Sequence, residues 1–270
     1  MSRHSYGQRS LHNLLLIDDD LVSREVLATL LTLSGLAVQT AEDGESALAL
    51  LAADSFAPEI ILVDVQLSGL SGVRLIEELR AQSRKWGRVR IFAISASCPP
   101  TGVLESADGF LLKPFGPEDL QMLLASQTRQ PGGPASGANA VPQPDPEAGD
   151  EIISSEILAQ LRAAMPESGV REIFSALVDD LDLRISAIQL AIRNGSATEV
   201  RRIGHAIKGG CSMAGAVQAA RLGAMIEQGA IEQPAASASI YHLDINAPVL
   251  LNLRAATASL RRMLCEGFPA

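Results

Sequence analysis

The sequence predicts two folds in one chain: an α/β domain built on a doubly wound, parallel five-stranded sheet, followed by an all-α four-helix bundle. Three observations lead to this prediction. Up to about residue 128, five strand-length apolar runs alternate with helical patterns, whereas only helical patterns follow from about residue 151. Residues 129–150 between them are rich in Pro, Gly and Ala and have no apolar period, which indicates a flexible linker.

The first domain, expected over residues 1–128 with its core at 13–128, alternates strands and helices. Its apolar runs are NLLLIDDD, AVQTAEDG, EIILVDVQ, RIFAISAS and GFLLKPF, separated by the helical patterns VSREVLATLLTLSG, ESALALLAA, GVRLIEELRAQ and a short VLESA, with PEDLQMLLAS at the end. Apolar runs without alternation indicate strands buried on both faces, as in a parallel sheet covered by helices on both sides. In such a sheet the active crevice lies beyond the carboxyl ends of the strands.

The second domain, expected over residues 151–270, reads as amphipathic helices joined by short breaks. The helical patterns are SEILAQLRAAM, REIFSALVDDLDLRISAIQLAIRNG, ATEVRRIGHAIKG with its continuation to MIEQG, and VLLNLRAATASLRRMLC. Each pattern has one apolar face, and helices of this kind bury those faces by packing into a bundle.

The composition limits the classes of function. A formal net charge of -9 and 3% aromatic residues argue against binding of nucleic acid through clustered cations or base stacking. No apolar stretch approaches the roughly 18 residues that a membrane span needs. The three cysteines have no metal-ligand spacing and fit a reducing compartment, so we expect a cytoplasmic protein. The four histidines are too dispersed for a zinc motif.

Polar residues follow four of the five expected strands. They are Asp18, Asp19 and Asp20 after the first run, Asp64 after the third, Ser95 after the fourth and Lys113 after the fifth. In a parallel sheet these strand ends meet at one rim, where clustered carboxylates repel each other unless a cation lies among them. Oxygen ligands suit a hard ion such as Mg2+ (or Mn2+). With the ion bound, one carboxylate is able to attack a phosphoryl group while a lysine and a hydroxyl stabilise the phosphoryl oxygens.

The first domain resembles a response-regulator receiver domain. The resemblance is carried by LLLIDDD, LVDVQLSGLSG, FAISA and FLLKPF, in this order and at suitable spacing. It implies that Asp64 is the phosphoacceptor and that Asp18 and Asp19 form the acidic pair. It also implies that Asp19, Asp64 and the backbone carbonyl of Gln66 ligate Mg2+, with Asp18 acting through water.

The resemblance assigns further roles, and the sequence departs from the family pattern at three places. Ser95 and Lys113 would be the switch hydroxyl and the switch lysine. Phe110 would be the aromatic switch residue, although it lacks the hydroxyl of the commoner tyrosine. Ser68 stands where the family often has proline. The stretch SCPPTGVLESADG leaves room for only a shortened fourth helix, which argues against a standard receiver dimer.

The segment RRIGHAIKGGCSMAGA in the second domain has two adjacent glycines inside a helical pattern. On a helix, His205, Lys208, Gly209 and Ser212 share one face, which we expect to face solvent. Gly210 lies on the opposite, apolar face, where it would let a neighbouring helix pack closely. Glycine costs about 1 kcal/mol in a helix relative to alanine, so the pair predicts a gain in access on one face and in packing on the other.

An exposed imidazole is a competent nucleophile for a phosphoryl group, because much of it is unprotonated near its reference pKa of about 6.5. Lys208, one turn after His205, would neutralise the charge of the phosphoryl group, and Gly209 would leave space for a partner. The segment resembles the phosphoacceptor helix of a histidine-containing phosphotransfer (HPt) domain, which implies that His205 is a second phosphoacceptor. Arg201 and Arg202 would flank it on the exposed side.

Two alternatives from other classes stay open. LLLIDDDLV also resembles the pattern of haloacid-dehalogenase-like phosphatases, in which Asp18 is the nucleophile and Asp20 the general acid, with Ser95 and Lys113 in later motifs. Against it, no further acidic metal motif follows Lys113, and Asp64 has no role. The other alternative is an interaction or gating module that is never phosphorylated. It predicts no Mg2+-dependent labelling by acetyl phosphate.

The sequence therefore predicts a two-component phosphorelay protein and not an enzyme, apart from self-phosphorylation of the receiver by small phosphodonors. Asp64 would accept a phosphoryl group, and His205 would carry one to or from partner aspartates. No GxxxxGK[ST] segment or other ATP-binding signature is present, so the phosphoryl group must come from elsewhere. We expect a sensor histidine kinase and a separate response regulator as partners, and no nucleic acid or membrane. Receiver-HPt contact and exchange within one chain are a hypothesis.

Overall fold

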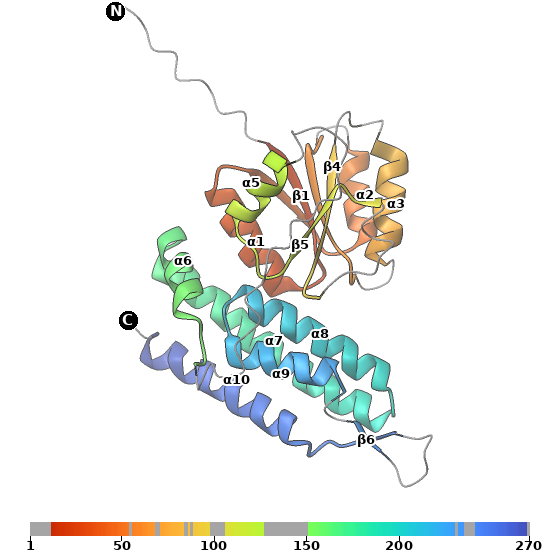
Figure 1. The fold of residues 1–270 in the computed structure, drawn as a ribbon. Coiled ribbons are helices and arrows are strands. Elements are labelled where there is room, and N and C mark those ends of the chain that lie inside the picture. Colours follow the sequence, from red (N-terminus) through yellow and green to blue (C-terminus); the bar gives the residue numbers. More distant parts are fainter. Residues whose placement is uncertain are drawn as a thin grey trace, which may run out of the picture. The chain divides into compact units, whose positions relative to one another are not determined.

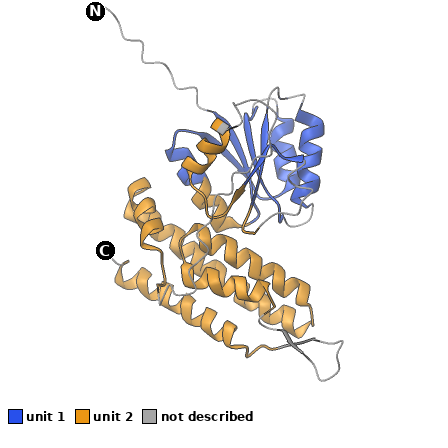
Figure 2. Ribbon diagram, viewed as in Figure 1, with its two compact units in different colours: residues 1–19, 28–94, 99–110 blue, residues 20–27, 95–98, 111–270 orange. Residues whose placement is uncertain are grey.

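The computed structural model describes residues 12–53, 56–67, 71–83, 86, 89–97, 106–126, 151–229, 232–234 and 241–268. The linker expected at 129–150, Ser68 and most of the stretch with the shortened fourth helix lie outside these residues. The chain divides into two compact units, one of residues 1–19, 28–94 and 99–110 and the other of residues 20–27, 95–98 and 111–270 (Figure 2). The α/β part of the chain and the helical part from residue 151 are described separately below.

The α/β part is a parallel five-stranded sheet, as predicted. Its strand order is β2-β1-β3-β4-β5. Its strands are β1 (Asn13–Ile17), β2 (Ala37–Ala41), β3 (Ile60–Asp64), β4 (Arg90–Ser95) and β5 (Gly109–Leu112). Its helices are α1 (Leu21–Leu33), α2 (Gly44–Ala52), α3 (Gly72–Gln82) and α5 (Pro117–Ser126). In Figure 1, α1 and α5 cover one face of the sheet, and α2 and α3 cover the other.

Burial explains why the strands read as unbroken apolar runs. Every residue of β3 is buried, and so are four of the five residues of β1, because both strands lie inside the sheet. In the edge strand β2 only Ala41 is buried, and its sequence AVQTA is correspondingly more polar. Local caps fix two helix starts: the side chain of Asp43 accepts a hydrogen bond from the backbone of Ser46 at α2, and Ser71 caps α3.

The register of the sheet fixes which strand ends lie side by side. Ile17 of β1 is paired with Val63 of β3, and both strands run in the same direction. The next residues along the chain, Asp18 and Asp64, therefore lie at the same rim of the sheet. Asp64 is itself paired with Ile94 of β4, one residue before Ser95.

The part after residue 151 is a helical bundle. Its helices are α6 (Ser155–Ala164), α7 (Glu167–Arg193), α8 (Ala197–Met213), α9 (Val217–Glu227) and α10 (Pro248–Glu266). Helix α8 packs against α7 and α9, and α10 packs against the same two helices, which gives the four-helix arrangement (Figure 1). Helix α6 is additional and packs against α7. Just before α6, the backbone N–H of Ser154 donates to the carbonyl of Gly215 at 2.7 Å.

The bundle also contains a short element that the sequence pattern did not predict. Strands β6 (Glu232–Pro234) and β7 (Tyr241–Leu243) pair antiparallel between α9 and α10. Each is three residues long, too short to show an apolar period. Among the described residues, no helix is both long and apolar enough to cross a membrane.

Candidate functional site

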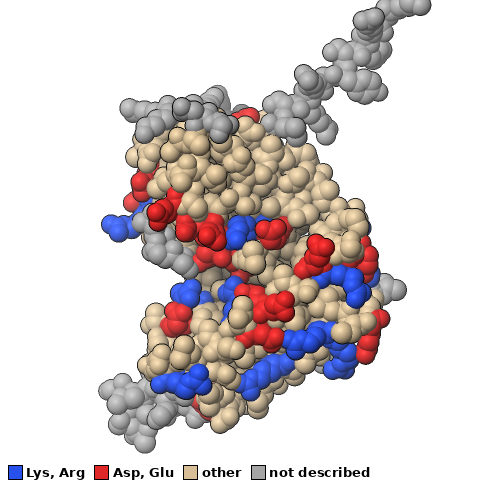
Figure 3. Space-filling model, turned by 180° about the vertical axis from the view of Figure 1, so that it is seen from behind, with Lys and Arg blue, Asp and Glu red and all other residues tan. Residues whose placement is uncertain are grey.

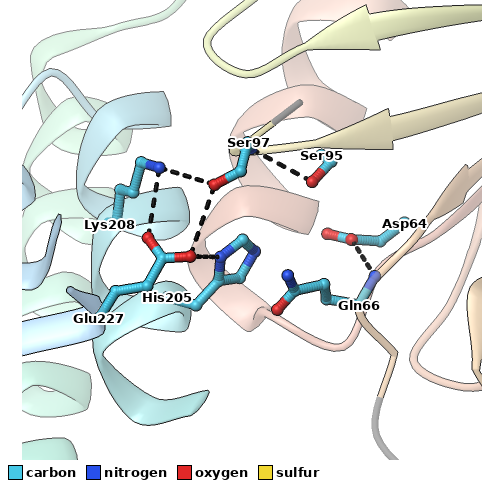
Figure 4. A network of polar contacts seen from close by, with 7 residues as sticks. All are labelled: Asp64, Gln66, Ser95, Ser97, His205, Lys208 and Glu227. Atoms are coloured by element: carbon cyan, nitrogen blue, oxygen red, sulfur yellow. Dashed lines mark hydrogen bonds and ion pairs between the residues drawn. The ribbon is translucent and has the colours of Figure 1, made fainter. Parts of the chain in front are cut away.

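The carboxyl rim of the sheet holds buried carboxylates. Asp18 and Asp64 are both buried, whereas Asp19 between β1 and α1 is half-buried. The backbone N–H of Gln66 donates to Oδ1 of Asp64 at 2.8 Å, which orients this carboxylate (Figure 4). After β3 ends at Asp64, the chain still runs beside β4, because the N–H of Val65 donates to the carbonyl of Ile94 at 2.9 Å.

Ser95 and Lys113 lie at the same rim and are buried. The backbone N–H of Lys113 donates to the carbonyl of Ser95 at 2.8 Å, so the ends of β4 and β5 are joined there. The hydroxyl of Ser95 accepts a hydrogen bond from the N–H of Ser97 at 3.2 Å (Figure 4). A buried ammonium needs a compensating negative charge, and the neighbouring strand ends supply the carboxylates. The functional roles of these side chains stay predictions.

Gly72 is a residue of this site that the sequence reasoning missed. It is the first residue of α3, and a Cβ there would lie 2.0 Å from the carbonyl oxygen of Asp64 and 2.7 Å from Cα of Val65. The loop after Asp64 therefore returns so closely to the strand end that only glycine fits. The signal in the sequence was a glycine at the start of a helical pattern that follows the aspartate by eight residues.

No group of three or more His, Cys, Asp or Glu side chains in the described ranges is arranged to hold a metal ion. The rim therefore does not hold the expected carboxylate cluster as a set of three direct ligands. The direct ligands that the receiver resemblance implies differ from such a set of three carboxylates. They are the carboxylates of Asp19 and Asp64 and one backbone carbonyl. Four carboxylates, those of buried Asp18, Asp20 and Asp64 and half-buried Asp19, outnumber the buried cations Arg24 and Lys113. The excess of negative charge suits a divalent cation.

Two further residues at this end of the sheet have local roles. Oδ1 of Asp20 accepts a hydrogen bond from the backbone N–H of Ser23 at 2.7 Å, so its carboxylate caps the start of α1. Phe110 of β5 is partly buried and packs against the apolar core of the sheet. The carboxylate of Asp20 thus acts as a helix cap, whereas the phosphatase alternative requires it to act as a general acid.

The second candidate site lies on α8 and α9. His205 lies on α8, and the solvent-facing position of its imidazole stays a prediction. Its Nδ1 lies 2.7 Å from Oε1 of Glu227, the last residue of α9. The ammonium of Lys208 lies 3.3 Å from Oε2 of the same carboxylate (Figure 4). One carboxylate thus bridges the imidazole and the lysine.

The sequence reasoning missed Glu227 because it considered α8 alone. The residue lies 22 positions after His205, and only the packing of α9 on α8 brings the two together. Two glycines make this packing close: a Cβ at Gly204 would lie 3.0 Å from the carbonyl oxygen of Gly223, and a Cβ at Gly223 would lie 3.0 Å from that of Gly204. The helix backbones touch at this point.

The role of Gly210 in helix packing stays a prediction. The inner face was otherwise predicted well, since Ile203 and Ile207 are buried. On the other face, the exposed positions expected for Gly209 and Ser212 stay predictions.

Opposing effects act on the pKa of Glu227. Burial acts to raise it, but the hydrogen bond and the charge of His205, together with Lys208, outweigh burial and lower the pKa below its ordinary value of 4.5. The carboxyl group is therefore ionised at neutral pH. An ionised carboxylate only accepts hydrogen bonds, and it is held by partners on both of its oxygens.

The basic rim around this site is partly neutralised. Arg201 and Arg202 are exposed, as expected. Arg202 forms an ion pair with Glu199 one turn earlier, at 2.7 Å. On the face drawn in Figure 3, basic and acidic side chains are intermixed over the helical part. The field around the site is thus weaker than a count of arginines suggests.

The remaining histidine and cysteine residues show no second reactive centre among the described side chains. His12 pairs with Glu59 at 2.5 Å near the start of β1, at the opposite end of that strand from Asp18. Cys211 is buried on α8, and its burial raises the pKa of the thiol, so it stays protonated. Cys265 is exposed on α10. Cys98, His4 and the side chain of His242 lie outside the described residues.

Comparisons with known proteins agree with the two-part organisation. The family model "Response regulator receiver domain" matches residues 14–125, and the model "Hpt domain" matches residues 172–262. The chain is 33% identical over 123 residues to "Probable transcriptional regulator ycf27" of Cyanidium caldarium, which covers 44% of this chain and 47% of that protein. It is 29% identical over 208 residues to "Sensor histidine kinase AruS" of Pseudomonas aeruginosa, which covers 75% of this chain and 19% of that protein.

A solved structure of chemotaxis protein CheY4 of Vibrio cholerae is 28% identical, with a TM-score of 0.39, and the match covers 43% of this chain and 98% of that one. The chain spans about half the length of the ycf27 regulators that it matches. The chain thus contains a response regulator receiver domain at residues 14–125 and an HPt domain at residues 172–262, a combination that indicates two-component phosphorelay signalling.

Proposed function

We propose that this protein is a phosphorelay intermediate that carries a phosphoryl group on Asp64 of the receiver domain and on His205 of the HPt domain. The observation that carries the proposal is that each candidate nucleophile has a lysine at its site. Lys113 is buried at the rim that holds Asp64, and Lys208 lies one turn after His205. The positive charge of each lysine offsets the charge that a phosphoryl group brings.

At the receiver site, the chain's own residues orient the attacking group. The N–H of Gln66 holds Oδ1 of Asp64, and an oxygen of this carboxylate attacks the phosphorus of a phosphohistidine on a partner. The N–P bond breaks and its electron pair returns to the partner's imidazole. The ammonium of Lys113 and the hydroxyl of Ser95 stabilise the phosphoryl oxygens.

Asp19, Asp64 and the backbone carbonyl of Gln66 would hold Mg2+ (or Mn2+), with Asp18 acting through water. When bound, the ion neutralises charge on the carboxylates and the phosphoryl oxygens. Oxygen donors and excess negative charge at the rim fit an ion of this kind. Ser95 and Phe110 then report the phosphorylated state by changing position.

At the HPt site, Nε2 of His205 is the attacking atom because Nδ1 faces Glu227. A partner that docks on α8 has to reach the Nε2 edge of the ring. The exposed Arg201 and Arg202, with Gly209 and Ser212, line the surface that such a partner contacts. A sensor histidine kinase and a separate response regulator, both in the cytoplasm, are the partners. The source of the phosphoryl group is the kinase, and small phosphodonors also serve the receiver.

Labelling with acetyl phosphate tests this proposal without a cognate kinase. In the presence of Mg2+, intact mass spectrometry should show one phosphoryl group on the wild-type chain, absent from Asp64→Asn and retained in Glu77→Gln, which removes an exposed carboxylate of α3. A label that persists in Asp64→Asn, or its absence from the wild type, would contradict the assignment. Label on Asp18 would favour the phosphatase alternative, which the family matches do not favour.

The same experiment addresses exchange between the two nucleophiles. Acetyl phosphate phosphorylates carboxylates and not imidazoles directly, so phosphohistidine on His205 can arise only through Asp64. Its appearance in the wild type and its loss in Asp64→Asn would support exchange. Its absence from the wild type would exclude exchange under these conditions and leave the two sites to different partners.

A further inference from the structure

The end of α3 is tied to the segment that leads into β5. Nη2 of Arg80 lies 2.7 Å from Oδ2 of Asp108. The same guanidinium donates from Nε and Nη2 to the carbonyl of Ser106, each at 3.4 Å. We call these contacts of Arg80 with Ser106 and Asp108 the clasp. We propose, resting on the phosphoacceptor role of Asp64, that the clasp stabilises the unphosphorylated receiver and breaks when Asp64 is phosphorylated.

The clasp lies where β5 is fixed to β4. The backbone N–H of Asp108 donates to the carbonyl of Ile91 at 2.7 Å, and the N–H of Ile91 donates to Oδ2 of Asp108 at 2.7 Å. Asp108 therefore sets the position of the residues that follow it, among them Phe110, the predicted aromatic switch residue. The carboxylate oxygen that binds Ile91 also binds Arg80, so a displacement of α3 acts directly on the start of β5.

The other end of α3 touches the phosphoacceptor. The N–H of Gly72 donates to the carbonyl of Val65 at 3.2 Å, and a Cβ at Gly72 would lie 2.0 Å from the carbonyl oxygen of Asp64. Backbone thus packs against backbone, and no flexible side chain lies between them to absorb a shift. Arg80 comes eight residues after Gly72, which is about 12 Å along a helix. Helix α3 therefore connects the phosphoacceptor with the clasp.

Phosphorylation acts on the loop from which α3 starts. The clasp coexists with the free carboxylate of Asp64, whose Oδ1 accepts a hydrogen bond from the N–H of Gln66 at 2.8 Å. An acyl phosphate leaves less negative charge on this oxygen than a carboxylate does, so the hydrogen bond weakens. The loop then changes position, and Gly72 moves with it because its N–H is bonded to Val65. A shift of the helix start is carried to Arg80 at the other end.

The strength of the clasp suits a contact that forms in one state and breaks in the other. The side chains of Arg80 and Asp108 are 36% and 31% exposed, so water weakens their attraction. A contact of this kind is too weak to resist a movement of the helix. By linkage, the factor by which phosphorylation weakens the clasp equals the factor by which the clasp weakens binding at Asp64.

The first test measures the affinity of the full-length chain for beryllofluoride, a mimic of the phosphoryl group, in the presence of Mg2+ by 19F NMR. Arg80→Ala and Asp108→Asn should each bind it about fivefold more tightly than the wild type, because the clasp no longer opposes binding. Arg80→Lys keeps the charge but loses the fork of donors, so its affinity should lie between these values. An unchanged or weaker affinity in Arg80→Ala or Asp108→Asn would overturn the proposal.

The direction of the change separates this role from a merely structural one. Arg80→Ala removes a positive charge, and this loss alone weakens the binding of an anion. The matched control is Arg74→Ala, which removes an exposed arginine from the first turn of α3 and should bind beryllofluoride no better than the wild type. The double variant of Arg80→Ala and Asp108→Asn should gain no more than either single variant, because both changes remove the same contact. Gains that add would contradict the clasp.

The second test observes the end of α3 directly. The Nε–H signal of Arg80 in 15N spectra, assigned by comparison with Arg80→Lys, should shift when beryllofluoride is added with Mg2+. Trp86 is the single tryptophan of the chain, and its N–H donates to the carbonyl of Ser83 just after α3 at 3.1 Å. Its fluorescence should change at the same beryllium concentration. Arg80 and Trp86 signals that stay unchanged in a saturated chain would overturn the proposal.

The two tests distinguish failure of this inference from failure of the proposed function. If the wild type binds no beryllofluoride although its amide spectrum shows a folded receiver, the phosphoacceptor role of Asp64 fails and this inference falls with it. If the wild type binds it, Asp64→Asn does not, and Arg80→Ala binds it with the affinity of the wild type, the clasp is only a structural tie and the role of Asp64 stands.

Discussion

Replacement of Gly223 by alanine tests the helix contact on which the His205 site depends. A Cβ at this position would lie 2.7 Å from the backbone nitrogen of Lys208, 2.8 Å from Cγ2 of Ile207 and 3.0 Å from the carbonyl oxygen of Gly204. Two of these atoms belong to the backbone and cannot rotate away. Ordinary contact begins at 3.4 Å, so α8 and α9 have to separate by about 0.7 Å at the closest atom.

Two opposing effects set the size of the change. Alanine is favoured over glycine in a helix by about 1 kcal/mol. Overpacking of a close contact costs about 1–3 kcal/mol, and the upper part of this range applies because backbone atoms are involved. We therefore expect the bundle to lose about 1–2 kcal/mol of stability. The same separation carries Glu227 away from the ring, so the hydrogen bond between Nδ1 of His205 and Glu227 should weaken.

Hydrogen exchange measures this loss within the bundle alone. The slowest amides of α8 and α9 should exchange about 5–30 times faster in Gly223→Ala than in the wild type. The matched control is Gly169→Ala on α7, where a Cβ would meet only the flexible side chain of Met165, with the nearest atom at 3.2 Å. Its amides should exchange as slowly as those of the wild type or more slowly. Equal exchange in the two variants would refute the reasoning.

Three further predictions follow from the two sites. Gly72→Ala would place a Cβ 2.0 Å from the carbonyl oxygen of Asp64, so we expect labelling of Asp64 by acetyl phosphate to fall at least about tenfold by intact mass; unchanged labelling would show that the loop tolerates the side chain. Lys208→Ala should slow labelling of His205 by phosphoramidate about tenfold, with partial recovery in Lys208→Arg, and an unchanged rate would remove the lysine from the site. The lowered pKa of Glu227 stabilises the bundle above its ordinary value of 4.5, and this stability is lost as the pH falls through the lowered pKa. Urea unfolding followed by circular dichroism should therefore depend less on pH in Glu227→Gln between about pH 5 and 3, whereas identical pH dependence in both chains would contradict this.

The receiver part was predictable because its signals are local in sequence. Buried parallel strands are unbroken apolar runs, and the residue after such a run lies at the carboxyl rim, as Asp18 and Asp64 do. Gly72 was missed because its requirement comes from the path of the loop, which returns to the carbonyl of Asp64. That path is a three-dimensional property, and the pattern of side chains does not encode it.

The HPt part was predicted less completely because its site depends on two helices. The apolar face of α8 followed from periodicity, with Ile203 and Ile207 buried. The contact of His205 with Glu227 arises from the close approach of α9, and a projection of one helix contains no information on that approach. Gly204 and Gly223 make a close contact between α8 and α9, and the sequence pattern did not single these two glycines out.

The most direct measurement of the central claim counts the phosphoryl groups that the chain accepts from phosphoramidate and Mg2+, by intact mass spectrometry. We predict up to two groups on the wild type, one on Asp64→Asn, one on His205→Gln and none on the double variant. A double variant that is still labelled, or a wild type that never accepts more than one group, would contradict an account in which one carboxylate and one imidazole both carry the phosphoryl group.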